Sequence, residues 1–392
     1  MIKYLTVAVV STSLIGFGVP ASARPGRGDL LSAMPITGLS VAEVTALLAR
    51  QAIDTGAVRH GVDAYRLEYR TAGPDGRPIT ASGAVVLPRD GGPARPTVAF
   101  QHGTIAAKAE AGSVGPDTNR TAPITFAAAG YTTVAPDYLG LGTGEGTHPY
   151  LDLPTETGAS VDLLRAADTF VRRAGRTLDR RVLVAGFSQG GPAAMALGRA
   201  LRDHPRFAPR AVASISGVHD LFGTQFPAAL DGTVTPKLAT ISTAYYLVAA
   251  NRLHHLYDRA SRAFRAPYDA IVENLFDGLH SGPEIAASLP ATPADLLTGW
   301  AVGQLRRPTG PMVRAARATD GSCVGWDPGV PVRLYAGTEG DELVPLGNST
   351  RCRAEFLEHG ADAPIVDLGP VNHNTSAKRA YPLVLEFFAG QR

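Results

Sequence analysis

The residues most able to do chemistry lie in the stretch 181–191, which reads RVLVAGFSQGG. A run of branched aliphatic residues stops at Gly186, Ser188 follows at a turn, and a helix of small residues is expected from Gly190. In the pattern G-x-S-x-G, a sharp turn between a strand and a helix lifts the serine hydroxyl above the edge of a sheet. Such a hydroxyl is a nucleophile once a base accepts its proton. We therefore predict Ser188 as a catalytic nucleophile; the alternative is a tight turn with a bystander serine.

A serine nucleophile needs a histidine as base, and the histidine needs an acid to hold its tautomer. Two loops that follow later predicted strands supply these groups, because one contains Asp341 and the other contains His373. Both loops come after the carboxyl ends of strands, where an open α/β sheet places its sites. We predict Asp341 as the acid and His373 as the base. Glu339 and Glu342 lie beside Asp341 and are interpreted as solvated loop residues.

Two backbone N–H groups are candidates for stabilising the negative charge of a reacting carbonyl. One belongs to Gln189, which directly follows the predicted nucleophile, and the other to Thr104 in the loop after an earlier strand. Gly103 lets the backbone of that loop pass close to a substrate oxygen, and His102 is interpreted as structural. The alternative for this loop is an ordinary turn at the end of a strand.

The glycine-rich segment 135–146 resembles a nucleotide-binding loop but fits none of the established patterns. It matches neither G-x-G-x-x-G nor a P-loop, since no Gly-Lys-Ser/Thr follows it. We interpret it as a loop over the edge of the sheet, with Tyr138, His148 and Phe187 as candidate pocket residues. The sequence implies no cofactor and no metal.

The composition is that of an ordinary globular chain. The protein has 392 residues, of which 45% are hydrophobic and 18% charged, and its net charge is +2. This charge gives no reason to expect nucleic acid or an acidic membrane surface as a partner. No segment after the N-terminus is long and apolar enough to predict integral membrane association. The expected partner is a small molecule or a lipid.

The N-terminus and the two cysteines point to export. Residues 1–23 combine Lys3, an apolar stretch and the small residues Ala21-Ser22-Ala23, which predicts a signal peptide cleaved after Ala23 and a secreted or periplasmic protein. In an oxidising compartment the two cysteines of the chain, Cys323 and Cys352, are expected to form a disulfide, although two buried thiols are the alternative. The bridge would flank the loop of Asp341, and we hypothesise that it holds this loop in place.

Hydrophobic periodicity divides the chain into a core and an insertion. After the signal peptide, residues 24–54 are interpreted as a lead-in, loose over 24–38, followed by a helix with a capping box at Ser40–Glu43. Alternation over 62–71 and 79–87 predicts a hairpin, and strand and helix patterns then alternate, which indicates a mostly parallel sheet with helices on both faces. The expected core is therefore 55–217 and 323–392, interrupted by a helical insertion at 218–322.

Within the core and the insertion, the pattern predicts individual elements. The strands expected after the hairpin cover residues 97–100, 131–135, 181–185, 211–216, 330–335 and 364–368. The helices expected in the core cover 121–129, 158–174, 189–203 and 376–389, and those in the insertion cover 238–252, 254–264 and 267–279. The insertion also carries large apolar residues that are candidates for an acyl or aryl site: Phe222, Phe226, Tyr245, Tyr246, Leu253, Tyr257, Phe264 and Phe276.

These motifs together resemble the α/β-hydrolase superfamily. The chain order Ser188, Asp341, His373 is the one found in that superfamily. More narrowly, the segment Asp137-Tyr138-x-Gly-Leu-Gly, followed by His148-Pro149-Tyr150, is similar to secretory lipases and related bacterial esterases. The resemblance covers about residues 80–392 and implies the α/β-hydrolase fold with a helical lid. It implies a serine hydrolase that cleaves carboxylic esters through an acyl-enzyme.

Two other functions stay open at this point. A serine peptidase or amidase would use the same three residues, and only matched ester and anilide substrates would separate it from an esterase. A binding protein of the same fold that has lost catalysis is the second alternative, and the complete set of three residues argues against it.

Overall fold

A nine-stranded sheet organises the part of the chain that the computed structural model describes, residues 26–90, 92 and 94–391. Its strands are β1 (Leu30–Leu39), β2 (Val62–Ala72), β3 (Pro78–Pro88), β4 (Ala94–Gln101), β5 (Thr132–Pro136), β6 (Thr177–Phe187), β7 (Ala208–Ile215), β8 (Val332–Ala336) and β9 (Ile365–Asp367). They lie in the order β1-β2-β3-β5-β4-β6-β7-β8-β9. The pairs from β1 to β5 are antiparallel, and those from β5 through β4 to β9 are parallel. The predicted mostly parallel sheet is confirmed.

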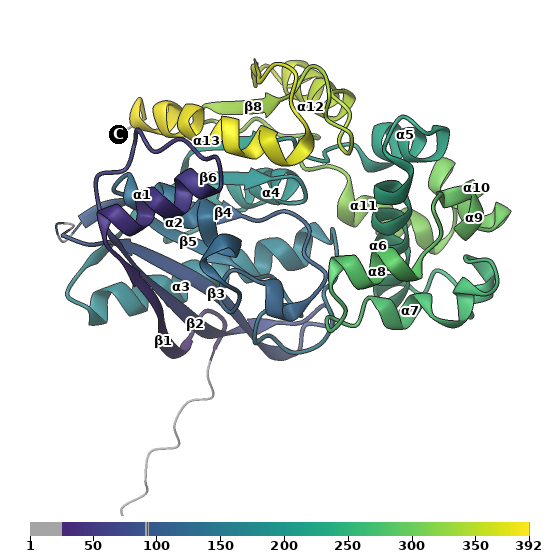
Figure 1. The fold of residues 1–392 in the computed structure, drawn as a ribbon, viewed down its shortest axis with the longest axis horizontal. Coiled ribbons are helices and arrows are strands. Elements are labelled where there is room, and N and C mark those ends of the chain that lie inside the picture. The colour runs from purple at the N-terminus through teal and green to yellow at the C-terminus, as the bar shows by residue number, and fades with distance from the viewer. Residues whose placement is uncertain (1–25, 91, 93, 392) are drawn as a thin grey trace, which may run out of the picture.

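Helices cover both faces of this sheet (Figure 1). Helices α1 (Val41–Arg50), α2 (Thr121–Ala128) and α13 (His373–Ala389) pack on one face, and α3 (Leu153–Arg173), α4 (Gly190–Arg202) and α12 (Gly347–Glu358) on the other. Strand residues alternate between the two cores: Leu183 and Ala185 face the first, whereas Val182 and Val184 face the second. Strands buried on both faces therefore read as continuous apolar runs.

The interval between β7 and β8 is helical in the described residues. It holds α5 (Phe226–Asp231), α6 (Pro236–His254), α7 (Val272–Leu275), α8 (Gly282–Ser288), α9 (Pro293–Leu296), α10 (Gly299–Arg306) and α11 (Pro311–Thr319). These helices share a hydrophobic cluster of their own and lie to the right of the sheet in Figure 1. A capping box at Ser281–Glu284 begins α8, and the one expected at Ser40–Glu43 begins α1. None of the described helices is long and apolar enough to span a bilayer.

Short helical turns complete the connections between these elements. Turns of 3-10 helix occupy Lys108–Glu110, Asp117–Arg120, Ala260–Arg262 and Tyr268–Ala270, and a π-helical turn occupies Leu221–Gln225. The signal peptide predicted for residues 1–23, with its cleavage point after Ala23, lies outside the described residues.

Two sequence-based predictions of secondary structure are wrong. Residues 30–39 are not a loose lead-in, because they form β1, an edge strand that pairs antiparallel with β2 from Leu30↔Tyr69 to Leu39↔Val62. An edge strand tolerates Pro35, since its missing N–H need not bond a neighbour. Residues 254–264 and 267–279 do not form long helices: α6 ends at His254, and His255 has a left-handed φ of 55°. The apolar spacing in these segments reflects burial in the insertion cluster and not a helical face.

The core between the sheet and its first helical layer gives a test of the fold. Phe126 of α2 is completely buried, and its ring packs against Phe100 of β4 and Phe388 of α13. Replacement of Phe126 by alanine should lower the free energy of unfolding by about 3–5 kcal/mol in urea titrations. The control Leu357→Ala, at a side chain that is 53% exposed, should change it by about 0.5 kcal/mol or less. Equal effects of the two changes would contradict this packing.

Candidate active site

The turn between β6 and α4 holds Ser188 in a strained backbone conformation. Its φ is 56°, in the left-handed region that side chains rarely adopt, and its N–H donates to the carbonyl of Ile215 at 2.9 Å. Such a turn is possible only with glycine at the positions two residues before and two residues after the serine. A Cβ on Gly186 would lie 1.8 Å from the carbonyl oxygen of Gly190, and a Cβ on Gly190 would lie 2.1 Å from that of Gln101. The glycines of the sequence pattern are therefore required by close backbone approach.

The structure brings the three predicted catalytic residues into contact. His373 Nε2 lies 2.9 Å from Ser188 Oγ, and His373 Nδ1 lies 3.1 Å from each carboxylate oxygen of Asp341. Ser188 and His373 are buried, with 6% and 5% of their surfaces exposed. Because Nδ1 faces a carboxylate, it carries the proton, and Nε2 is left free to accept the proton of the serine hydroxyl.

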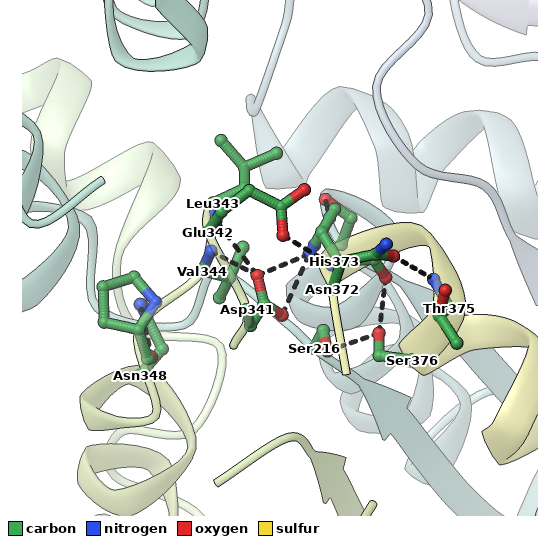
Figure 2. A network of polar contacts seen from close by, with 12 residues as sticks. Ser216, Asp341, Glu342, Leu343, Val344, Asn348, Asn372, His373, Thr375 and Ser376 are labelled. Atoms are coloured by element: carbon green, nitrogen blue, oxygen red, sulfur yellow. Dashed lines mark hydrogen bonds and ion pairs between the residues drawn. The ribbon is translucent and has the colours of Figure 1, made fainter. Parts of the chain in front are cut away.

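Asp341 is held as an ionised carboxylate. It accepts from the backbone N–H groups of Leu343 at 3.1 Å and Val344 at 2.8 Å, besides the ring of His373 (Figure 2). Burial opposes the ionisation of this group, but the hydrogen bond and charge of His373 and the two backbone donors outweigh it, and the pKa of Asp341 is lowered. An anion at this position stabilises the imidazolium that forms when His373 takes up a proton.

Of the two glutamates beside Asp341, neither replaces it as the partner of the histidine ring. Glu342 accepts from the backbone N–H of His373 at 2.9 Å, as Figure 2 shows, and so anchors the first residue of α13. Glu339 contributes backbone groups only, through a bridge to Pro370 and a bond from the N–H of Val371. The interpretation of Glu342 as a merely solvated residue was therefore incomplete.

The start of α13 fixes the backbone of His373. Asn372 caps the helix by accepting from the N–H of Thr375 at 2.8 Å, and Ser376 Oγ donates to the carbonyl of His373 at 2.6 Å. Ser376 in turn lies 2.8 Å from Ser216, which follows β7 (Figure 2). The histidine is thus tied to the neighbouring strand end as well as to its own helix.

Thr104 and Gln189, the two candidate oxyanion donors, differ in burial. Thr104 lines both cavities that Ser188 borders, and its hydroxyl lies 2.9 Å from the hydroxyl of Tyr150. Gln189 is fully buried at the N-terminus of α4. The ring of His102 lies with its nitrogens 2.6 Å and 3.2 Å from the carbonyl oxygens of Gly103 and Asp137, where it supports the Thr104 loop.

The candidate pocket residues differ in their placement. Phe187 lines a cavity with Ser188, and its ring centre lies 4.8 Å from that of His373. Tyr138 and His148 do not line either cavity that borders Ser188; both are buried behind the site, stacked at 5.8 Å. Their prediction as lining residues was wrong because the glycine-rich loop folds inward: a Cβ on Gly142 would lie 2.2 Å from Asp137 Oδ2.

Ser188 lies between two cavities of different character. An apolar cavity of about 190 Å³ opens toward the insertion, with walls that include Leu221, Phe226, Leu238, Ile241 and Tyr246. A wider cavity of about 560 Å³ also borders Ser188, with mixed walls in which polar residues such as Glu110 and Asn119 lie among apolar ones such as Ile105 and Phe187. Of the large apolar residues singled out in the insertion, Phe226, Tyr245 and Tyr246 line the apolar cavity. A substrate that spans Ser188 thus meets an apolar pocket at one end and a wider pocket with more polar groups at the other.

The acid loop is tied to the insertion and to a disulfide. Cys323 and Cys352 form the predicted bridge, and Cys352 lies on α12, which directly follows the loop. On the insertion side, Gln225 Nε2 donates to the carbonyl of Leu343 at 2.8 Å, and the N–H of Thr235 donates to that of Glu342 at 2.9 Å. Sequence reasoning missed Gln225, since nothing in its surroundings marks it. In the described chain, the one group of three potential metal ligands is His219 with these two cysteines, whose sulfurs are bonded to each other.

Comparison with solved structures identifies the fold. A candidate hydrolase from Legionella pneumophila superposes with a TM-score of 0.85 at 23% identity, covering 92% of this chain and 98% of its own. The rice cell wall degrading esterase LipA from Xanthomonas oryzae superposes with a TM-score of 0.80 at 27% identity, covering 94% of this chain and 100% of its own. Lipase A from Candida antarctica in its closed state superposes with a TM-score of 0.64 at 15% identity, covering 94% of this chain and 82% of its own. No protein-family model matches the chain, and no curated protein matches it in sequence. The chain has the α/β-hydrolase fold and resembles the esterases and lipases that share it.

The contacts of Asp341 and Glu342 predict unequal roles. Asp341→Asn removes the charge that faces His373 Nδ1, and the rate constant for labelling of Ser188 by a fluorophosphonate should fall by about 10³-fold or more. The matched variant Glu342→Gln keeps an acceptor for the backbone N–H of His373, and the rate constant should fall by less than about tenfold. A larger loss in Glu342→Gln than in Asp341→Asn would contradict this assignment.

The disulfide predicts a link between stability and reactivity. Replacing both Cys323 and Cys352 by serine opens a loop of 29 residues and should lower the free energy of unfolding by about 3 kcal/mol. If the bridge holds the acid loop, Ser188 should also react more slowly with the fluorophosphonate in the folded variant. Unchanged labelling in the serine variant, or in the reduced protein, would show that the bridge does not position Asp341.

Proposed function

We propose that this protein is a serine hydrolase that cleaves carboxylic esters through an acyl-enzyme. The observation that carries the proposal is the unbroken chain of contacts from Asp341 through His373 to Ser188, at 3.1 Å and 2.9 Å, at the junction of the two cavities. The likeness to an esterase and a lipase of the same fold supports it.

In the proposed mechanism, Ser188 Oγ attacks the ester carbonyl while His373 Nε2 accepts the proton of the serine hydroxyl. Asp341 stabilises the resulting imidazolium through Nδ1–H. The backbone N–H groups of Gln189 and Thr104 donate to the oxyanion of the tetrahedral intermediate. His373 then gives its proton to the departing alcohol, and the acyl group stays on Ser188. A water molecule, deprotonated by His373, attacks the acyl-enzyme; the bond between the acyl group and Ser188 Oγ breaks, His373 gives its proton to Oγ, and the acid is released.

The two cavities assign the two halves of the substrate. The apolar cavity is the place for the acyl chain, because its aliphatic and aromatic walls gain free energy from the burial of methylene groups. The wider cavity, which carries more polar groups, is the exit for the alcohol, which must leave before water enters. The apolar cavity, at about 190 Å³, exceeds the roughly 150 Å³ that suffices for benzene, so a short or medium chain or a single ring fits it.

The proposed place of action is outside the cytoplasm. The signal-peptide pattern of residues 1–23 supports export, and the disulfide between Cys323 and Cys352 agrees with an oxidising compartment. Its substrate is a small-molecule or lipid ester that reaches the enzyme in that compartment.

A series of p-nitrophenyl esters from acetate to palmitate tests this function. The value of kcat/KM should rise by roughly fourfold for each added methylene while the cavity fills, as expected for about 0.8 kcal/mol per buried group. It should peak between butyrate and octanoate and be at least about tenfold lower for palmitate. Ser188→Ala should abolish turnover at every length.

Other outcomes would redirect the assignment. Faster turnover of a matched anilide than of the ester would make the protein an amidase. An absence of Ser188-dependent turnover on either substrate would contradict the hydrolase proposal.

A further inference from the structure

A buried polar chain lies directly beneath the nucleophile turn. The side chain of Gln189, the residue after Ser188, is fully buried, and its Nε2 lies 2.7 Å from Glu156 Oε1 and 2.9 Å from His148 Nε2. Glu156 belongs to the first turn of α3, and His148 follows the glycine-rich loop. His148 and Glu156, which are both distant from Gln189 in sequence, thus meet the side chain of a residue whose backbone N–H is one of the two proposed oxyanion donors.

The surroundings of His148 fix the direction of these hydrogen bonds. His148 Nδ1 lies 3.0 Å from the carbonyl oxygen of Leu139, and a carbonyl only accepts, so Nδ1 carries the proton. Burial, helped by the nearby His102, lowers the pKa of His148 to about 3, so the ring is neutral and Nε2 is an acceptor. The amide nitrogen of Gln189 therefore donates to both His148 and Glu156, and its two N–H groups are both used.

Glu156 differs from the other buried carboxylates of its helix. Asp162 and Asp168 are paired with arginines, whereas within the described residues no ion pair involves Glu156. Burial is the main cause that raises the pKa of Glu156 to about 8; Asp152 also raises it, and the hydrogen bonds from Gln189 and from the backbone of Leu151 oppose the shift. The other titratable groups that face it are Tyr138, Tyr150 and Tyr245, and His148 lies beyond Gln189. Glu156 is thus a neutral acid at pH 7.

We propose that Glu156 is a positioning residue, which holds the side chain of Gln189 and thereby fixes the backbone N–H of Gln189 beside Ser188. The inference rests on the proposed function, since it concerns the oxyanion donor of that reaction. Gln189 is fully buried, and the His148 ring that accepts from it is itself packed by rings, because Tyr138 stacks on it and Tyr245 meets its edge at 6.1 Å. In such a dry site, loss of the Glu156 acceptor leaves a buried N–H unpaired, and Gln189 must shift to satisfy it.

The protonation of Glu156 gives this role a distinctive pH dependence. Its folded pKa lies above the ordinary carboxyl value of about 4.3, so the stability contributed by the neutral form is fully present below that pH. This contribution is lost as the pH rises through about 8. Above that pH, a negative charge lies beneath the place where the oxyanion forms, and kcat should fall.

The test compares three variants on p-nitrophenyl butyrate. Glu156→Ala removes the acceptor, Glu156→Gln keeps a neutral acceptor that cannot ionise, and Asp162→Asn removes the charge of a buried carboxylate six residues further along the same helix. We expect Glu156→Ala to lower kcat by about 10- to 100-fold with KM within about threefold, because an oxyanion donor acts in the transition state. Glu156→Gln should restore kcat at pH 7 to within about threefold of the wild-type value. In the wild type kcat should decline as the pH rises through about 8, and in Glu156→Gln this decline should occur at a higher pH.

The melting temperature from pH 5 to 9 gives a readout that does not depend on turnover. As the pH rises, the melting temperature of Glu156→Gln should increase relative to that of the wild type, because only the wild type has a buried carboxyl group at this position that must lose its proton. Asp162→Asn should lower the melting temperature and leave kcat within about twofold.

The outcomes separate this inference from the proposed function. If the wild type neither turns over the ester nor reacts with a fluorophosphonate, the proposed function fails. If the wild type is active and Glu156→Ala keeps its kcat, or Asp162→Asn loses as much kcat as Glu156→Ala, then Glu156 has no positioning role. A decline of kcat at alkaline pH that is the same in wild type and Glu156→Gln would also overturn the inference.

Discussion

Ser188 is held at a positive φ by a turn that leaves no room for side chains, and most of the site is arranged around this constraint. Backbone atoms of Gly190 and Gln101 occupy the space in which the Cβ atoms of Gly186 and Gly190 would lie. The N–H of Ser188 is also bound to the carbonyl of Ile215 at the end of the next strand. The turn therefore cannot relax without separating β4, β6 and β7, and the strain is maintained by the sheet as a whole.

The parallel half of the sheet explains why the acid and the base reach this serine. Strands β6, β8 and β9 point the same way, so the loops of Ser188, Asp341 and His373 leave from the same edge. Each loop is then fixed by its own contacts: the Asp341 loop by the insertion, and His373 by its helix cap and by Glu342. The insertion is thus more than one wall of the apolar cavity, since it also anchors the acid loop.

The sequence was sufficient for the elements with strong local signals. The nucleophile turn, the hairpin, the alternation of strands and helices and the order of the three site residues have short-range patterns, and all of these predicted elements are present. Strand β1 was missed because its pairing with β2 is a tertiary contact, whereas Pro35 and Gly38 locally argue against a strand. Helix α12 was also not predicted, and the buried apolar residues of 254–279 imitated helical spacing without forming long helices.

The roles of single polar residues were the least predictable part of the site. Glu156 lies in an amphipathic helix where a glutamate normally faces water, and only the tertiary structure shows that it is buried against Gln189. The same holds for Gln225 and Glu342, whose partners are backbone groups of distant segments. Tyr138 and His148 were expected in the pocket because they flank the glycine-rich loop, but the inward fold of that loop places them one layer behind it. Sequence spacing identifies the reacting groups well, but it identifies the groups that support them poorly.

The central claim is that Ser188 carries the acyl group during the reaction. The most direct measurement is mass spectrometry of the protein quenched in acid within milliseconds of mixing with p-nitrophenyl butyrate, followed by peptide mapping. The account predicts a butyryl adduct on the peptide that contains Ser188, formed as fast as the burst of p-nitrophenol and absent from Ser188→Ala. Release of p-nitrophenol with no adduct on Ser188, or with the adduct on another residue, would contradict it.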